Sequence, residues 1–341
     1  MSADAEGPSR REVLATLALA GSSGMIGLRP TRAGAEPPPE TTRLKVVHRM
    51  DTSCISPQYF AGELLRAEGF TDLEYIKIVG AGGIERALAS GDAHLSMHFA
   101  SSLIRQIDAG APITLLAGGH VGCNVLFGGA RVRTIRDLKG KVIGLPAGPG
   151  SVHGGVLTLL LAHVGLDPHR DVIWANHPAA EQMQLLADGK IDAFLALPPV
   201  SHELRAKKIG RVLVDSAVDR PWSQYFCCMI AGHSEFVRRH PVAVKRALRA
   251  LLKSADVCGA QPERVARELV EKGFTQHYDY TLQTLTSLPY GKWREYDAED
   301  AVRFYALRMQ ETKLIKSSPQ KILAQGTDWR FLNELKKELK G

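Results

Sequence analysis

Residues Lys141–Gly155, with the sequence KVIGLPAGPGSVHGG, decide the fold of this chain. The apolar start, Lys141–Leu145, predicts a short strand, and Ser151 is a suitable N-cap for a helix that continues through the apolar run Val156–Val164. The Gly/Pro turn between them leaves backbone N–H groups unpaired at the helix start, where an anionic or polar group can bind. A βα connection whose glycines serve only the geometry of the turn explains the stretch equally well at this point.

Units of the same kind precede this stretch, each with a short apolar strand, a small or polar turn and a helix. This alternation predicts a parallel sheet covered on both faces, whose ligands bind at the carboxyl ends of the strands. The predicted strands are Leu44–Met50, Leu73–Val79, His94–Phe99 and Pro112–Ala117. Their carboxyl ends are Asp51–Ser53, Gly80–Gly83, Phe99–Ser101 and Gly119-His120.

The pattern restarts after Gly122 and predicts a second unit of the same design. Two similar segments, Ala87–Ala93 and Leu185–Ala193, support this duplicated plan. A strand over Gln224–Gly232 returns the chain, and amphipathic helices follow it. We therefore expect an α/β protein with two lobes, a central cleft and a helical C-terminal extension. Residues 44–122 and 228–341 would form lobe 1, and residues 123–227 lobe 2.

The first 35 residues have the pattern of a twin-arginine signal peptide. Arg10-Arg11 precede the apolar stretch Val13–Leu28, and Ala33–Ala35 form an A-x-A cleavage site. The apolar stretch is too short and too rich in Gly and Ser for a membrane span. A chance arginine pair in a disordered tail is the alternative. We expect cleavage near Ala35, a leader over residues 36–43 and a periplasmic location.

Charge and cysteine content argue against several classes of protein. The net charge of +7 is spread along 341 residues, without a basic stripe interleaved with aromatic residues, which argues against nucleic-acid binding. The five cysteines are odd in number and lack the spacing of metal ligands, which argues against a disulfide framework or a metal site. Cys227 and Cys228 fall in an apolar, strand-like run, where neighbours point to opposite faces, and buried free thiols are expected.

Motifs of catalysis are missing from the sequence. Gly80–Glu85 departs from G-x-G-x-x-G because Glu85 replaces the last glycine, and Gly148–Ser151 lacks the Gly-Lys-Ser/Thr of a phosphate-binding loop. Neither G-x-S-x-G nor H-E-x-x-H occurs. His98, His120 and His153 are the histidines expected in the cleft, but none has an evident catalytic partner. We therefore expect ligand binding without enzyme activity, cofactor or metal.

Four segments together resemble the nitrate/sulfonate/taurine-type substrate-binding proteins of ABC importers, a group also described as THI5/NMT1-like. The segments are Asp137–Gly144 followed by Gly150-Ser151, Gly80–Gly82 followed by Ala87–Ala93, Arg220–Trp222 continuing to Met229–Ala231, and Glu235–Ala247. The resemblance extends over about residues 44–312, and it depends on the order and spacing of the segments more than on any one of them.

The resemblance implies a type 2 periplasmic-binding-protein fold, in which two lobes joined by two crossovers close on a ligand. The crossovers would lie near Val121–Gly129 and Val218–Cys227. The ligand-facing residues that it implies are Ser53, Gly82, Phe99, Ser101, His120, Ser151, Val152, His153 and Pro198, with Trp222 or Tyr225 near the hinge.

The expected function is that of an exported, monomeric receptor that passes a small organic acid, sulfonate or related polar or aromatic metabolite to an ABC permease in the inner membrane. Two alternatives stay open. One is a pyrimidine-precursor synthase of the same family, with a lysine-bound pyridoxal cofactor and a cysteine-rich motif that Cys227-Cys228 matches poorly. The other is a ligand-binding sensory protein without a permease. The sequence does not name the ligand.

Overall fold

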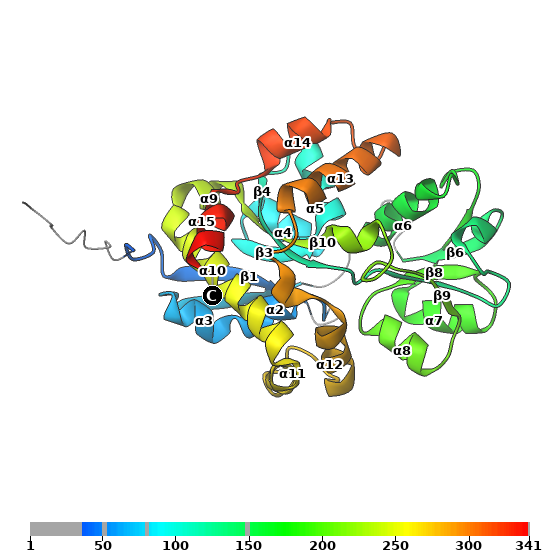
Figure 1. Ribbon diagram of the computed structural model, residues 1–341, viewed down its shortest axis with the longest axis horizontal. Coiled ribbons are helices and arrows are strands. Elements are labelled where there is room, and N and C mark those ends of the chain that lie inside the picture. Colours follow the sequence, from blue (N-terminus) through cyan, green and yellow to red (C-terminus); the bar gives the residue numbers. More distant parts are fainter. Residues whose placement is uncertain (1–35, 50–52, 79–81, 147–150, 340–341) are drawn as a thin grey trace, which may run out of the picture. The chain divides into compact units, whose positions relative to one another are not determined.

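The computed structural model describes residues 36–49, 53–78, 82–146 and 151–339 (Figure 1). The chain divides into a unit that ends at Pro37 and a unit from Pro38 onward, and the fold described below is that of the second unit. The predicted signal peptide, residues 1–35, lies outside the described residues. Among the described helices, none combines the length and the apolar character that crossing a membrane requires.

The first sheet has five strands in the order β2-β1-β3-β10-β4. β1 pairs in parallel with β2 and β3, whereas β10 runs antiparallel between β3 and β4. The strands are β1 Arg43–His48, β2 Asp72–Lys77, β3 Leu95–Phe99, β4 Ile113–Val121 and β10 Phe226–His233. β3 is buried along its whole length, although its sequence, LSMHF, alternates apolar and polar residues as a half-exposed strand would.

The second sheet repeats this plan in the order β7-β6-β8-β5-β9. β6 pairs in parallel with β7 and β8, and β5 runs antiparallel between β8 and β9. The strands are β5 Val125–Gly128, β6 Val142–Leu145, β7 Ile173–Asn176, β8 Ala193–Ala196 and β9 Arg211–Asp215. The antiparallel strand thus takes the fourth place in both sheets, which agrees with the duplicated plan predicted from the sequence.

Two short crossovers link the sheets and are hydrogen-bonded to each other. The N–H of Asn124, between β4 and β5, donates to Ser216 Oγ at 2.9 Å, and the N–H of Ser216, between β9 and β10, donates to the carbonyl of Asn124 at 2.9 Å. Gly122 has a φ of 86°, and a Cβ there would lie 2.7 Å from the Cβ of Ala217. Glycine therefore permits both the left-handed turn and the close approach of the two crossovers.

Eleven of the described helices belong to the half of the molecule that contains the first sheet. They pack on this sheet or on one another beside it. They are α2 Ser56–Phe60, α3 Gly62–Ala67, α4 Gly83–Ser90, α5 Ala100–Asp108, α9 Ser234–Arg239, α10 Pro241–Ala260, α11 Pro262–Glu271, α12 Tyr278–Ser287, α13 Ala298–Glu311, α14 Pro319–Gly326 and α15 Arg330–Glu338. The longest of them, α10, packs on α2, α3 and α15. The Glu40 carboxylate accepts the N–H groups of Val242 and Ala243 at 2.9 and 2.8 Å, so it caps α10.

The second sheet is covered by α6 Val152–His163, α7 Ala179–Ala187 and α8 Val200–Ala206. Side chains of β5 alternate between two cores, because Leu126 joins the main hydrophobic core while Val125 and Phe127 join a smaller one that includes Leu204 of α8. Short 3-10 turns at Ile135–Leu138, Trp222–Gln224 and Tyr290–Lys292 complete the elements.

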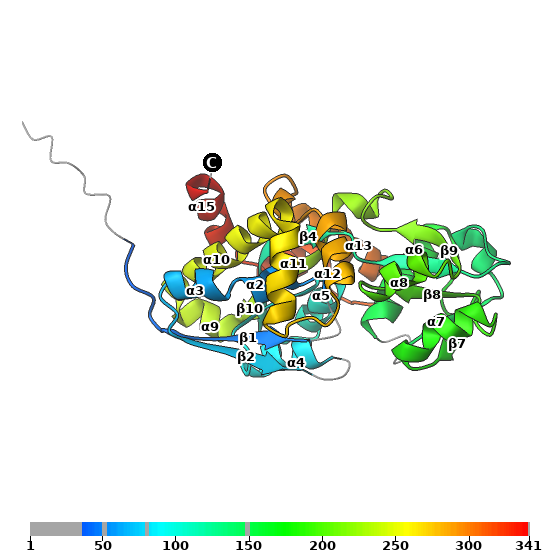
Figure 2. The same cartoon turned by 90° about the horizontal axis from the view of Figure 1, so that it is seen from below.

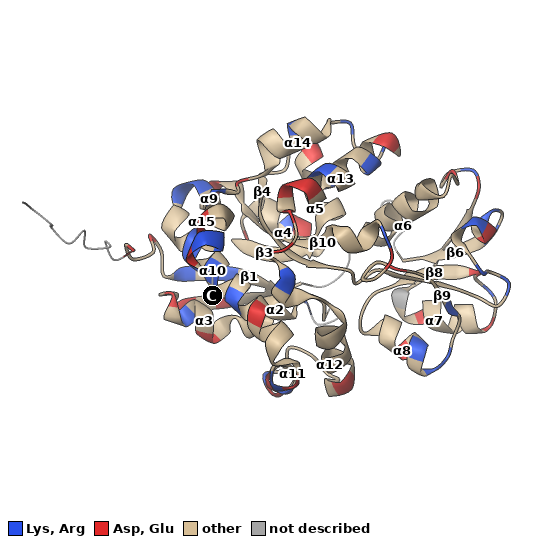
Figure 3. Cartoon of the chain, viewed as in Figure 1, with Lys and Arg blue, Asp and Glu red and all other residues tan. Residues whose placement is uncertain are grey.

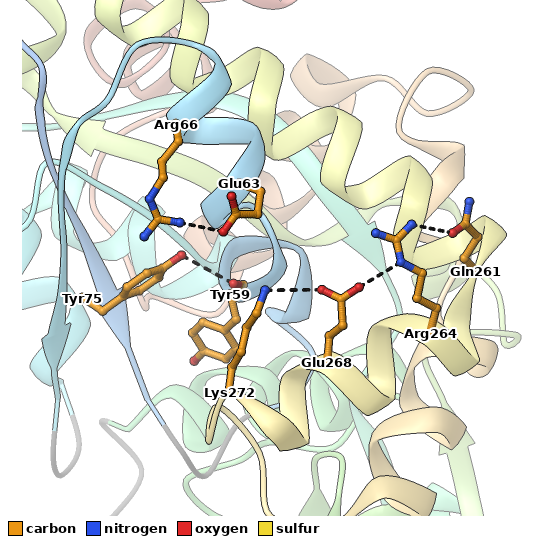
Figure 4. A network of polar contacts seen from close by, with 8 residues as sticks. All are labelled: Tyr59, Glu63, Arg66, Tyr75, Gln261, Arg264, Glu268 and Lys272. Carbon is orange, nitrogen blue, oxygen red and sulfur yellow. Dashed lines mark hydrogen bonds and ion pairs between the residues drawn. The ribbon is translucent and has the colours of Figure 1, made fainter.

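Surface charges are mixed in sign. Figure 3 shows basic and acidic residues interspersed over both groups of helices. A polar network on α3 and α11 is typical (Figure 4): Glu63 pairs with Arg66 at 2.8 Å, and Glu268 pairs with Arg264 and Lys272 at 2.8 and 3.3 Å. Exposed pairs of this kind stabilise a fold by no more than about 1 kcal/mol each. Burial of the aliphatic core is therefore the larger contribution.

Candidate functional site

Two helices that begin after strands of different sheets pack against each other (Figures 1 and 2). α5 follows β3 directly, and α6 follows β6 after a segment of which residues 147–150 lie outside the described part. The predicted cap is confirmed, because Ser151 Oγ accepts the N–H of Gly154 at 3.1 Å. Gly155 is buried, and outside its own helix backbone and chain neighbours no atom of the described residues lies within 4 Å of the place of a Cβ there, so the described residues leave space beside the first turn of α6.

Several predicted ligand contacts lie on these two helix starts. Phe99 and Ser101 are 7% and 5% exposed at the start of α5, and Val152 and His153 are half-buried on the first turn of α6. The ring of Phe99 meets that of His98 edge-on, with centroids 5.4 Å apart. The predicted residues Phe99, Ser101 and Ser151–His153 therefore lie at the starts of two helices that pack against each other.

Other predicted contacts lie elsewhere. Ser53 Oγ is 3.0 Å from Thr284 Oγ1 of α12, so its hydroxyl is already hydrogen-bonded. Gly82, with a φ of 70°, occupies the N-cap of α4, while Asp51-Thr52 and Gly80-Ala81 lie outside the described residues. Pro198 is buried at the start of α8.

Trp222 and Tyr225 pack on α13 of the C-terminal helices. The Tyr225 ring stacks on Phe304 with centroids 3.9 Å apart and an interplanar angle of 7°, and Trp222 meets Phe304 edge-on at 5.6 Å. One face of Tyr225 is thus covered, and Trp222 is 4% exposed. Both residues hold the second crossover against α13, which is a structural role that sequence reasoning did not assign.

A pocket of about 450 Å³ lies between elements of the second sheet and α12. Helix α12 also contacts α8, and the two lie near each other in Figure 2. The pocket is lined by Cys123, Val125, Pro198, Ser201, His202, Arg205, Asp215, Ala217, Val218, Gln283, Thr286, Ser287 and Leu288. Arg205 pairs with Asp215 at 2.7 Å. Burial, with Arg205 nearby, lowers the pKa of His202 to about 4, so this imidazole is neutral at pH 7. The pocket therefore offers hydroxyl, amide and imidazole groups and one cation already paired.

A buried carboxylate at the start of α4 has partners that sequence reasoning missed. Glu85 Oε1 accepts the hydroxyl proton of Ser102 and lies 3.2 Å from His98 Nε2, and all three residues are 3% exposed. Burial alone would raise the pKa of Glu85, but His98 and the Ser102 hydroxyl hold it well below its usual range. Both groups contact the carboxylate, so the hydroxyl is not activated by the imidazole as a nucleophile requires.

Four of the chain's five cysteines meet at the crossovers. Four buried residues each contribute one possible ligand atom, a thiol sulfur or an imidazole nitrogen. These atoms lie within 4.8 Å of one another and belong to Cys54, His120, Cys123 and Cys228. Cys227 borders this cluster, with its Sγ 3.1 Å from Cys123 Sγ and 3.8 Å from Cys228 Sγ. The expectation that Cys227 and Cys228 point to opposite faces is wrong. The register of β10 against β4 shifts on both sides of Cys228, and this bulge turns the two thiols to the same side.

The cluster concentrates charge. Burial opposes ionisation of Cys228, but hydrogen bonds from neighbouring thiols and the charge on His120 hold its pKa well below the usual value. Burial alone would lower the pKa of His120, but the Cys228 thiolate raises it to about 10. The fifth cysteine, Cys258 on α10, lies apart, with burial raising its pKa. The spacing His120-x-x-Cys123 was the one local signal of this cluster in the sequence.

Comparison with known proteins assigns the chain to a family. The profile of the family described as NMT1/THI5 like matches residues 65–265, which is more than half of the chain. The protein belongs to the NMT1/THI5-like family. The resemblance predicted from the sequence is thereby confirmed. A search among curated proteins gave no significant match for this NMT1/THI5-like protein.

Solved structures share the fold of this NMT1/THI5-like protein at low sequence identity. The periplasmic nitrate-binding protein NrtA from Synechocystis PCC 6803 is 14% identical, with a TM-score of 0.71 over 89% of this chain and 90% of that one. The ligand-binding component of an ABC-type import system from Staphylococcus aureus, solved with zinc bound, is 15% identical (TM-score 0.69; 86% and 99%). The alkanesulfonate-binding protein SsuA from Xanthomonas axonopodis pv. citri, solved with MOPS, is 16% identical (0.67; 85% and 99%). The predicted periplasmic-binding-protein fold is therefore confirmed.

Proposed function

We propose that this protein is a solute-binding receptor of an ABC importer, which captures a small organic acid, sulfonate or related polar metabolite. The observation that carries the proposal is the packing of α5 against α6, whose starts lie at the carboxyl ends of strands in two different sheets. Such helix starts supply N–H donors for an anionic head group. The printed descriptions of NrtA and SsuA, a nitrate-binding and an alkanesulfonate-binding protein, support the same class of ligand.

The proposal extends to the arrangement of the chain. Residues 44–122 with 228–341 would form one lobe and residues 123–227 the other, joined by the crossovers at Asn124 and Ser216. Rotation about these crossovers would close the lobes on the ligand, and the permease would respond to the closed form. Export by the twin-arginine route to the periplasm, and action as a monomer without catalysis, belong to the same proposal.

The character of the ligand follows from what lines the site. The described residues leave space beside Gly155 at the α6 start, whereas Phe304 covers one face of Tyr225. An aromatic ligand would therefore rely on Phe99, and the polar head would rely on Ser101 and the start of α6. Hydrogen bonds to neutral donors favour an oxygen-rich head group of modest charge.

Calorimetric titration of the purified protein tests the proposal. The panel contains alkanesulfonates, carboxylates, nitrate and pyrimidines, and X-ray scattering is recorded with and without each compound. We expect saturable binding of at least one compound, accompanied by a smaller radius of gyration. Absence of binding throughout the panel, together with unchanged scattering, would contradict a receptor function.

A further inference from the structure

The buried thiol cluster at the crossovers has the composition of a metal site. Cys54 follows β1, His120 lies on β4, Cys123 lies in the first crossover and Cys228 lies on β10, so four segments that are distant in sequence converge. Their exposed fractions are between 0% and 2%. We propose that Cys54, His120, Cys123 and Cys228 bind one zinc-class metal ion through three sulfur atoms and one imidazole nitrogen. This inference does not depend on the proposed receptor function.

The spacing of the ligand atoms suits a tetrahedral ion. Zinc–sulfur bonds of about 2.3 Å give a tetrahedron with edges of about 3.8 Å. The four ligand atoms already lie within 4.8 Å of one another, so closure of the site requires side-chain shifts of roughly 1 Å or less. Sulfur and imidazole are ligands that zinc prefers, whereas calcium and magnesium require oxygen.

His120 supplies independent evidence for a ligand. Its Nδ1 is 3.0 Å from the carbonyl oxygen of Val121, to which Nδ1–H donates, and a metal ion at Nε2 would displace the proton that this nitrogen carries in the metal-free protein. Nε2 is buried and has no hydrogen-bond partner in the described part of the chain. Metal-binding histidines are usually held in this way, with the second ring nitrogen donating to a carbonyl or carboxylate. A metal ion would satisfy the orphaned nitrogen.

The backbone departs from regular geometry at two of the cluster's cysteines, Cys123 and Cys228. Cys123 has a φ of 76°, in the left-handed region that residues with a Cβ rarely adopt. The register of β10 against β4 shifts on both sides of Cys228, and nearby the ring of Phe226 occupies the place where Gly118 of β4 would have a Cβ. Both departures from regular structure bring a sulfur atom into the cluster. Cys123 in addition lines the 450 Å³ pocket, which gives an ion a path to the site.

Metal analysis of the full chain tests the proposal. The protein is purified under reducing conditions without a polyhistidine tag, loaded with Zn²⁺ or Co²⁺ and freed of excess ion. We expect one equivalent of zinc per chain, and with cobalt the intense absorption of a tetrahedral thiolate complex. X-ray absorption at the zinc edge should give three sulfur neighbours and one nitrogen neighbour at about 2.3 and 2.0 Å. Oxygen-dominated coordination, or no retained ion, would overturn the assignment without recourse to any variant.

Variants identify the ligands. Cys54→Ser and Cys228→Ser should weaken zinc binding by more than the roughly 10–100-fold that removal of an outer hydrogen-bond partner costs. Cys258→Ser is the matched control, because Cys258 is equally buried and lies outside the cluster. Cys227→Ser should retain the ion. Equal losses in the Cys258 and Cys54 variants, or loss in Cys227→Ser with retention in Cys54→Ser, would refute the ligand set.

Oxidation is the competing fate of these thiols. Cys123 and Cys227 are close enough that a small shift would allow a disulfide. Intact-mass measurement of the zinc-loaded protein under non-reducing conditions should show all five thiols reduced. A mass lower by two hydrogens, with the bond mapped to Cys123 and Cys227 and no ion retained, would replace the metal site with a disulfide.

Discussion

Ser151 is the residue through which the proposed ligand site can be tested most directly. Its hydroxyl caps α6 by accepting the N–H of Gly154, on the helix turn where the described residues leave space beside Gly155. Removal of the hydroxyl therefore affects both the helix and any ligand held at the helix start. The two effects must be separated by a control that alters a cap alone.

Ser151→Ala should weaken ligand binding by roughly 1–3 kcal/mol, because a polar contact is lost, and lower the free energy of unfolding by about 1 kcal/mol. Ser318→Ala is the control, since Ser318 is an equally half-buried N-cap of α14, with its Oγ accepting the N–H of Lys321. It should lower stability by a similar amount and leave affinity unchanged. Calorimetry and urea unfolding measure both quantities, and equal affinities in the two variants would remove Ser151 from the site.

His94 should make stability depend on pH. Its ring stacks on Phe236 at 4.1 Å, and its Nδ1 accepts the N–H of Lys45 at 3.3 Å, which only the neutral ring can do. Burial, with nearby cations, lowers the pKa of His94 from 6.5 to about 4. As the pH falls, His94 is protonated in the unfolded chain at a higher pH than in the folded protein. The contribution of neutral His94 to stability is therefore fully present above pH 6.5 and is lost as the pH falls towards 4.

Urea unfolding at several pH values between 7.5 and 4.5 measures this contribution. Half-exposure of the ring limits the loss to about 2 kcal/mol. His94→Gln should show a shallower fall in stability than the wild type, whereas His169→Gln, at an exposed position, should follow the wild type. Parallel curves for wild type and His94→Gln would contradict the assignment.

At the scale of the element, α12 shows what the sequence could not predict. Its residues Tyr278–Ser287 are rich in tyrosine and threonine, which favour strands, so local preference does not indicate a helix. Contacts with other elements place it, among them the bond between Thr284 and Ser53. The strands and α9–α11 were predictable because their apolar runs are bounded by glycine, proline or charged residues.

The Thr284–Ser53 bond predicts a difference between two threonines of one helix. Thr284→Val leaves the buried Ser53 hydroxyl without its partner and should lower the free energy of unfolding by about 1–3 kcal/mol. Thr286→Val is the control, because Thr286 is exposed and bonds only to carbonyls of its own helix. Chemical unfolding measures both, and equal effects would show that the inter-element bond contributes nothing.

The same distinction applies to the candidate sites. Contacts between residues close in sequence could be predicted, whereas contacts between distant residues could not. The Ser151 cap could be predicted because the cap and its helix are contiguous in the sequence. The thiol cluster could not, since Cys54 and Cys228 are brought together only by the pairing of β10 in the first sheet. The stacking of Tyr225 on Phe304 likewise depends on where α13 lies. Such contacts can be predicted from the sequence only when the two partners are close along the chain.

At the scale of the whole molecule, the two hydrogen bonds between Asn124 and Ser216 hold the crossovers together. Both residues are 5% exposed. Ser216→Ala removes the acceptor of the Asn124 N–H and should lower stability by about 1–3 kcal/mol. Hydrogen exchange should accelerate at residues 122–124 and 216–218 and stay unchanged in β3 and β6. Uniform acceleration in all strands would mean that the crossovers are not an independent hinge.

The place of β10 between β3 and β4 has a consequence for the newborn polypeptide. Among the described strands, β4 pairs only with β10, so a ribosome that has just released Val121 leaves β4 with an open edge. The edge of β4 stays unpaired until the entire second sheet has been synthesised. Unpaired strand edges can form hydrogen bonds with other chains and so promote aggregation. Translation beyond His233 therefore completes the first sheet, although not the helices that pack on it, and a nascent chain stalled earlier should need chaperone protection.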